Sequence, residues 1–150
     1  MALVNAQLGL GLALFSLAMP VAVIFAISRL GWNVLAARYP RTGPAPAPLT
    51  VFGYGCLNGW VGYNGGLILS ADDTGLFLAT WPGLLAWCHP PVFIPWSQLV
   101  DARARRRIWK TYYTLDLKGA PEIDFALSEG DLRLVRPWLT KAGVPVVELP

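Results

Sequence analysis

"LILSADDTGLFLAT" (residues 67–80) has the composition of a β-hairpin. Apolar residues fill both arms of this segment, and "DDTG" (72–75) separates them with residues that tolerate the left-handed backbone conformations of tight turns. Runs of this kind on either side of a turn are typical of antiparallel strands. We therefore expect one strand over 60–71, a returning strand over 75–81, and a mainly-β domain around them.

The segments on either side of this hairpin show the same pattern, in which turn residues separate short apolar runs. The three residues Asn64, Gly65 and Gly66 predict a bulge or tight turn inside the 60–71 strand. In "SQLVDARARR" (97–106) charged and apolar residues alternate, which predicts a strand with one solvated face. The remaining strands are expected at 50–57, 92–95, 111–117 and 122–127.

The end of the chain changes from strand-like to helical spacing. Ser128 is a plausible N-cap, and Leu132, Val135 and Leu139 recur on one helical face. Gly143 followed by Pro145 is a stop signal, whereas Pro137 inside the run predicts a break. We expect six or seven strands followed by one amphipathic helix that closes an open end of a barrel or sandwich.

The beginning of the chain is unusually apolar. Hydrophobic residues make up 55% of the sequence and charged residues 14%, against about 45–50% and about 25% in ordinary soluble domains. The segment 8–27 holds no charged residue and matches the roughly 20 residues that cross a bilayer as a helix. It predicts a single-pass transmembrane anchor. A cleaved signal peptide is the alternative, but no basic residue precedes the apolar run, which is also long for a signal peptide.

The charges after this span predict its orientation. Arg29, Arg38 and Arg41 all follow it, so the positive-inside rule puts the amino terminus outside and the remainder in the cytoplasm. The chain then divides into an anchor (1–30), a juxtamembrane segment with a Pro/Ala linker (31–50) and a β domain (51–150). We expect four residues of the first two segments at the membrane interface: Arg29, Trp32, Arg38 and Tyr39.

Reactive side chains are sparse. Cys88 and His89 are adjacent, but a nucleophilic cysteine needs a base aimed at its sulfur, and Pro90 pushes the backbone of His89 to extended values. The stretch that follows is better read as a stiff loop feeding a strand. One histidine and two separated cysteines are too few for a structural zinc site. We expect no catalytic residues, no metal and no cofactor, with Cys56 and Cys88 as free thiols in a reducing cytoplasm.

Tryptophan is frequent, with seven residues in the chain. Most of them are expected to fill the core or its rim. The segment "WPGLLAW" (81–87) is apolar enough that an exposed member would mark a partner or membrane contact. The five predicted for the core or its rim are Trp60, Trp81, Trp87, Trp96 and Trp138.

A basic run is the most informative polar feature of the β domain. "ARARRRIWK" (102–110) holds five of the twelve basic residues of the chain and no acidic one. A cationic hairpin with an exposed tryptophan suits an anionic membrane surface or an acidic partner. The alternative is a solvated edge strand whose charges prevent edge-to-edge pairing. The predicted contact residues are Arg103, Arg105, Arg106, Arg107, Trp109 and Lys110.

Three motifs carry a resemblance over nearly the whole chain: "GW…LAARYP" (31–40), "GYNGGL…GLFLA" (62–79) and "HPPVFIPW" (89–96). They are similar to those of a set of uncharacterised bacterial single-pass membrane proteins. The strand order and "FIPWSQLVDARAR" (93–105) resemble the pleckstrin-homology-like (PH-like) fold of bacterial PH and GRAM-type modules. The resemblance implies a partly open seven-strand barrel capped by a C-terminal helix, at the bacterial inner membrane, and it implies no reaction.

The expected function is that of a non-enzymatic interaction module. Its cytoplasmic PH-like domain would bind a protein partner or the anionic membrane surface. The alternative is a small accessory subunit of a larger membrane complex, docked through its transmembrane helix. An enzyme is the least favoured reading. Neither nucleic acid nor a small-molecule substrate is expected, since a membrane-tethered domain with a net charge of +3 has little reason to bind nucleic acid.

Overall fold

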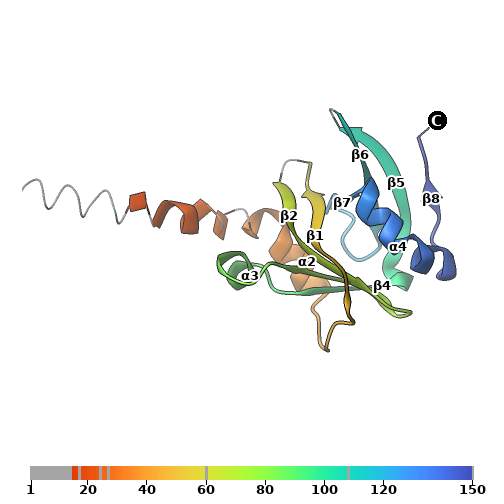
Figure 1. Cartoon of the computed structure of the whole chain (residues 1–150), viewed down its shortest axis with the longest axis horizontal. Coiled ribbons are helices and arrows are strands. Elements are labelled where there is room, and N and C mark those ends of the chain that lie inside the picture. Colours follow the sequence, from red (N-terminus) through yellow and green to blue (C-terminus); the bar gives the residue numbers. More distant parts are fainter. Residues whose placement is uncertain are drawn as a thin grey trace, which may run out of the picture.

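The computed structural model describes residues 15–16, 18–23, 25–26, 28–59, 61–107 and 109–149. Its elements form a mainly-β domain with one longer helix near the end of the chain (Figure 1). The strands are β1 (Pro48–Leu57), β2 (Val61–Ala71), β3 (Gly75–Thr80), β4 (Val92–Pro95), β5 (Leu99–Arg107), β6 (Lys110–Leu117), β7 (Phe125–Ser128) and β8 (Val146–Val147). The helical elements are η1 (Ser28–Trp32), α2 (Asn33–Arg38), α3 (Leu84–Cys88), the short turn η2 (Trp96–Gln98) and α4 (Glu129–Lys141).

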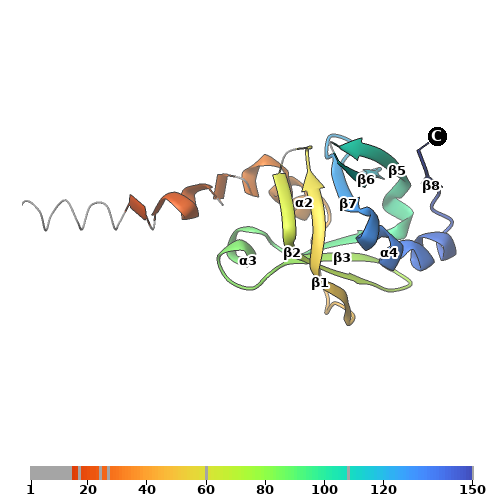
Figure 2. The same ribbon diagram turned by 45° about the horizontal axis from the view of Figure 1, so that its top comes forward.

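The strands form one open, curled sheet in the order β4-β3-β2-β1-β7-β6-β5-β8 (Figures 1 and 2). Neighbours from β4 to β5 pair antiparallel, and the core lies inside the curl. The predicted mainly-β domain with a C-terminal helix is confirmed at this level. The structure adds an eighth strand that the sequence did not suggest, since β8 has only two residues and pairs parallel with β5.

The hairpin of β2 and β3 agrees with its prediction. Ala71 pairs with Leu76, and the Asp72 carboxylate closes the turn by accepting from the Thr74 amide at 2.7 Å and from the Thr74 hydroxyl at 2.5 Å. The hydroxyl bond and the backbone bonds lower the pKa of Asp72. The predicted bulge is also present, because Gly65 adopts a φ of 69° and the register between β1 and β2 shifts beside it.

Helix α4 is predicted correctly, but it does not break at its proline. The Ser128 hydroxyl accepts from the Asp131 amide at 3.2 Å and caps the helix as expected. Buried side chains at Leu132, Val135 and Leu139 join the core. The helix runs through Pro137, which is exposed, and a carbonyl that loses its amide donor on this side can be hydrated.

Two predicted boundaries in the β domain are wrong. The position of the apolar segment 82–91 between two strands, with prolines at both of its ends, predicts a loop, yet its middle forms the short helix α3. The strand expected at 122–127 begins only at Phe125, and the Glu122 and Asp124 carboxylates before it pair with Arg38 and Arg107.

The described residues before Ser28 are helical and exposed (Figure 1). Among the described residues no helix is both long and apolar enough to span a membrane. Much of the predicted span 8–27 lies outside the described residues, so the anchor stays a prediction. The described part of this segment exposes large apolar side chains, with Phe15 at 66% and Phe25 at 49%.

Residues 28–40 belong to the β domain, whereas the sequence predicted a juxtamembrane segment. Trp32 and Leu35 are fully buried, and Tyr39 is 6% exposed. The chain leaves helical geometry at Gly31, where a Cβ atom would lie 2.7 Å from the Leu57 side chain. A residue without a side chain is therefore needed where η1 meets the sheet. The expected domain boundary at residue 51 is too late in the chain.

The loop after α3 fastens this helical segment to the sheet. The Ser28 hydroxyl donates to the Cys88 carbonyl, and the Trp32 indole nitrogen donates to the Pro90 carbonyl at 2.8 Å. The His89 ring, 1% exposed, packs against the Trp32 ring with centroids 5.3 Å apart. We call residues 88–91 the clasp, because they hold the helical segment that leads out of the domain. The two prolines that stiffen this loop place its carbonyls for these bonds.

Candidate functional site

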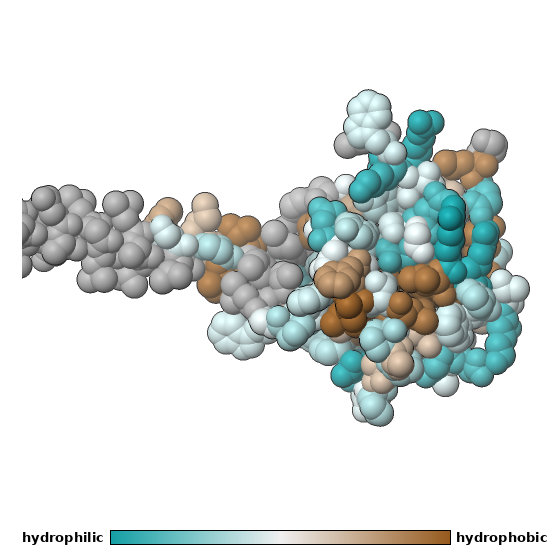
Figure 3. Space-filling model, viewed as in Figure 1, coloured by the Kyte–Doolittle hydropathy of each residue, from teal (hydrophilic) through white to brown (hydrophobic). Residues whose placement is uncertain are grey.

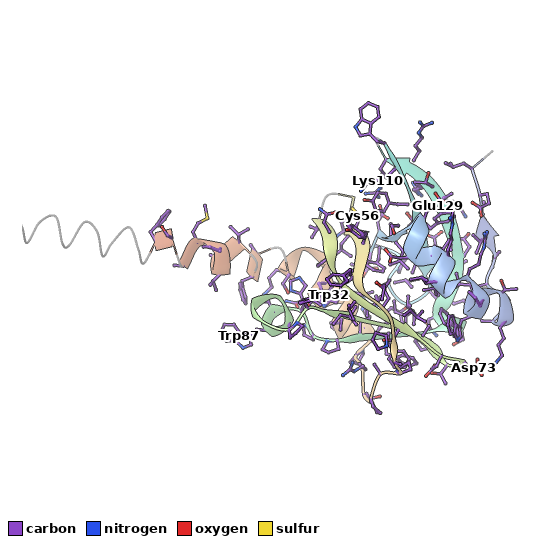
Figure 4. The ribbon with its side chains drawn as sticks, in the orientation of Figure 1. Trp32, Cys56, Asp73, Trp87, Lys110 and Glu129 are labelled. Atoms are coloured by element: carbon purple, nitrogen blue, oxygen red, sulfur yellow. The ribbon has the colours of Figure 1, made fainter. Side chains whose placement is uncertain are left out.

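The hairpin of β5 and β6 carries the predicted basic run. Trp109 lies in its turn and is 91% exposed, the highest value among the large apolar side chains that the structure describes. Figure 4 shows Lys110 beside this turn, at the edge of the domain. In Figure 3 hydrophilic side chains gather over the part of the molecule that carries β5, β6 and α4. The hairpin therefore presents an indole and several cations to solvent.

Two of the predicted contact cations are already paired inside the domain. The Arg103 guanidinium lies 2.7 Å from the Asp101 carboxylate and 4.0 Å from that of Asp116. Burial raises the pKa of Asp116, and its hydrogen bond with Asp101 raises it further. The hydrogen bond and the charge of Asp101 raise the pKa of Arg103. The Arg103 guanidinium is thus mainly engaged by the carboxylates of Asp101 and Asp116, on β5 and β6, and is less available to a binding partner.

Arg107 is the second paired cation. Its guanidinium donates to the Asp124 carboxylate at 2.6 Å and to the Cys56 sulfur at 3.3 Å. Its side chain is 22% exposed, much less than that of Arg103 at 51%. Asp124, which precedes β7, thus holds Arg107 toward the sheet, where it lines a hollow with Cys56 and Tyr112, and its part in a contact surface stays a prediction.

Three cations remain available at the hairpin. Arg105, Arg106 and Lys110 are exposed, and no carboxylate of the described residues lies within ion-pair distance of them. The Lys110 ammonium lies 5.7 Å from the centre of the Tyr54 ring, within the range of a cation–π contact. With Trp109 they form what we call the hairpin site.

Two open hollows flank the hairpin site. The first has a volume of about 420 Å³ and lies between the start of β6, Tyr54 and the start of α4. The second, about 350 Å³, lies over Cys56, Gly62 and Asn64. Trp109, Lys110 and Tyr112 line both of them. A ligand that filled both hollows would therefore contact the Lys110 ammonium and the Trp109 indole between them.

Cys56 lies at the floor of the second hollow and is 7% exposed. Burial raises the pKa of its thiol, although the charge of Arg107 opposes this effect. In the unfolded chain this thiol ionises at a lower pH. The stability that it contributes is therefore complete below that lower pKa and is lost as the pH rises through the higher pKa of the folded protein.

We predict that the two cysteines react at different rates with iodoacetamide. Both are free thiols in the structure, but Cys88 is only half-buried. Because the thiolate is the nucleophile and burial suppresses it at Cys56, Cys88 should be alkylated first at neutral pH. Mass spectrometry of the folded protein over time, at neutral and at alkaline pH, measures this order. Equal rates in the folded state would contradict it, and the unfolded chain is the control in which both should react.

The residues predicted at the membrane interface separate into two groups. Trp32 and Tyr39 cannot reach headgroups, because both are core residues, and the Tyr39 hydroxyl accepts from the Gly119 amide at 2.9 Å. Arg38 is exposed, but it donates to the Gly119 carbonyl at 2.7 Å. Arg29 alone remains on the exposed helical segment, with its guanidinium 4.7 Å from the centre of the Phe25 ring.

Sequence reasoning missed the residues that shape the hollows. Tyr54, Asn64 and Tyr112 come from three strands, and only the register of the sheet brings them to one face. The alternation of β6 could have indicated Tyr112, since it faces the same side as Arg105, its cross-strand partner. Among the described residues no three His, Cys, Asp or Glu side chains gather as a metal site would require.

Comparison with known proteins adds no relative: no family model matches the chain, and no curated protein matches it either.

Proposed function

We propose that the protein is a non-enzymatic, membrane-anchored interaction module whose hairpin site binds an acidic protein partner. Its β domain would face the cytoplasm from a bacterial inner membrane, with the amino terminus outside. The observation that carries this proposal is the hairpin site itself: three cations that lack carboxylate partners within the described residues lie on the same hairpin as an indole that is 91% exposed.

Membrane anchoring is supported by the exposed apolar side chains before residue 28. Phe15, Met19 and Phe25 are each about half exposed or more, on a helical segment that extends away from the domain (Figure 1). Such surface is unfavourable in water and favourable in lipid. The arginines that follow, at 29, 38 and 41, support a cytoplasmic domain.

A PH-like fold is supported by the strand arrangement. Seven antiparallel strands in the order β4-β3-β2-β1-β7-β6-β5 are followed directly by helix α4, as the sequence resemblance implies. The parallel strand β8 is an addition to that pattern. Fold alone does not define an activity, so the proposed function is argued from the hairpin site.

An acidic protein fits the hairpin site better than the surface of the anchoring membrane does. In Figure 1 the tip of the β5–β6 hairpin lies at the top of the domain, off the axis of the helical segment that leaves at the left, whereas α3 reaches farthest toward that side. A bilayer around the apolar segment would meet the α3 end of the domain first. The hollows beside Trp109 offer room for side chains of a folded or extended partner.

We predict that removing the three cations releases this partner. The full-length chain, with a photo-crosslinking amino acid in place of Thr111, which lines the first hollow, is irradiated in native membranes with and without Arg105→Ala, Arg106→Ala and Lys110→Ala. If the three charges together contribute about 1.4 kcal/mol, the yield of a protein adduct should fall by about tenfold. Added salt should lower the yield in the same way, because these cations are exposed.

The matched control removes three exposed cations that already have partners: Lys118→Ala, Arg133→Ala and Lys141→Ala. Lys118 donates to the Ser97 carbonyl, while the other two pair with Glu129 and Asp73. This control changes the net charge equally and should leave the adduct in place. An adduct formed only with lipid would overturn the proposal in favour of surface docking. A complex that survives all six substitutions would favour an accessory subunit held by its membrane segment.

A further inference from the structure

The segment from Trp81 to Pro91 stands apart from the rest of the domain surface. Its eleven residues include no Asp, Glu, Lys or Arg, and its one histidine is buried. Trp81 is 41% exposed and Trp87 is 79% exposed. Trp87 was expected to help fill the core or its rim, but α3 carries it outward. An exposed indole on a segment without charged residues differs in kind from Trp109, which lies on a hairpin with several cations.

The position of α3 relative to the helical segment is fixed by the clasp. The last residue of α3, Cys88, accepts at its carbonyl from the Ser28 hydroxyl, and Trp32 donates to Pro90 two residues later. Figure 4 shows Trp87 at the end of the domain from which the helical segment departs. Any bilayer around that segment would therefore lie next to α3.

We infer that α3 and the loop before it form a membrane-contact foot, in which Trp87 rests at the headgroup level of the bilayer. The inference rests on the proposed membrane anchoring. We assign lipid as the partner of this surface, because the segment presents an indole, prolines and small residues. It holds no carboxylate or ammonium group that would lose its water on contact with the bilayer. Tryptophan is enriched at this depth of membrane proteins.

Arg29 supports the same placement from the helical side. It is exposed, it follows the apolar segment after a single residue, and it lies within η1 (Ser28–Trp32), the element that the clasp holds. Its guanidinium and the Trp87 indole would meet the same interface from two elements. The interfacial role predicted for Trp32 thus passes to Trp87, because Trp32 is required inside the domain.

The test is quenching of tryptophan fluorescence by brominated lipid. Full-length protein is reconstituted into nanodiscs of zwitterionic lipid with or without bromine near the headgroup end of the acyl chains. The signal of Trp87 is the difference between the wild type and Trp87→Phe, and Trp109→Phe supplies the matched difference for the hairpin. Because an indole at the interface lies within reach of shallow bromines, the Trp87 signal should fall by about half. The Trp109 signal should not change.

The outcomes distinguish the inference from the anchoring on which it rests. If the chain fails to enter nanodiscs and is extracted from native membranes by alkaline carbonate, the anchoring itself is wrong. If it enters nanodiscs and the Trp87 signal is not quenched, the foot is wrong while the anchoring holds. Quenching of Trp109 equal to that of Trp87 would also overturn the inference, since the domain would then lie on its hairpin.

Discussion

Replacing Trp32 by alanine should lower the free energy of unfolding of the β domain by about 3–5 kcal/mol, as for other buried tryptophans. Trp32 is fully buried and packs against the Tyr63 ring at a centroid distance of 5.2 Å. The substitution would leave a large cavity and would leave the Pro90 carbonyl without its indole donor. Chemical unfolding of the full-length protein in detergent, followed by circular dichroism, measures the change.

The control for this prediction lies two residues later, in α2. Val34 is 37% exposed, so Val34→Ala should change the stability by no more than about 0.5 kcal/mol. If Trp32 lay at headgroup level, as the sequence suggests, Trp32→Ala would leave the domain as stable as Val34→Ala does. The two variants therefore test directly whether residues 28–40 belong to the domain.

Replacing Asp131 by alanine should cost about 2–3 kcal/mol, because a charged hydrogen bond and part of a helix cap are lost together. The Asp131 carboxylate is 5% exposed and accepts from the Tyr54 amide of β1 at 2.7 Å. It also accepts from the Ser128 hydroxyl at 2.5 Å. Without it a backbone amide of β1 loses its partner, and α4 loses a hydrogen bond to the sheet, although its apolar side chains stay packed in the core.

A neighbouring acid provides the comparison. Glu129 occupies the same turn of α4, but it is half-exposed and pairs only with the exposed Arg133. Glu129→Ala should therefore cost no more than about 0.5 kcal/mol, the usual contribution of an exposed pair one helical turn apart. Thermal unfolding of both variants in the same detergent gives the difference. Equal losses would show that the charge near the helix start matters and that the bond to β1 does not.

The local sequence pattern was sufficient to predict the hairpins and the last helix, α4. The turn at Asp72 is closed by bonds within three residues, and the cap of α4 joins Ser128 to Asp131. Both depend on contacts between near neighbours in the chain, which composition and spacing reflect directly. The position of Trp109 in the turn of the β5–β6 hairpin was predictable for the same reason.

The candidate site was predictable only in part. The run of arginines is visible in the sequence, but its pairing is not: Asp124 engages Arg107 from a loop 17 positions later in the chain. The hollows beside the hairpin need β1 and β2 next to β6 and β7, an arrangement that follows from sheet order. Sequence alone therefore named the cations of the hairpin site but could not separate the paired from the available ones.

For this protein the amino-acid pattern determined an apolar first segment, a set of antiparallel strands, a final helix and a basic hairpin, since each is a property of residues close together in the chain. Tertiary structure alone decided which tryptophan is buried and which faces out. Trp32 lies between Gly31 and Asn33, Trp87 lies between Ala86 and Cys88, and these neighbours do not predict which of the two indoles is buried. The clasp draws Trp32 under the sheet and leaves Trp87 on the outside of α3, because burial depends on contacts between segments 58 positions apart.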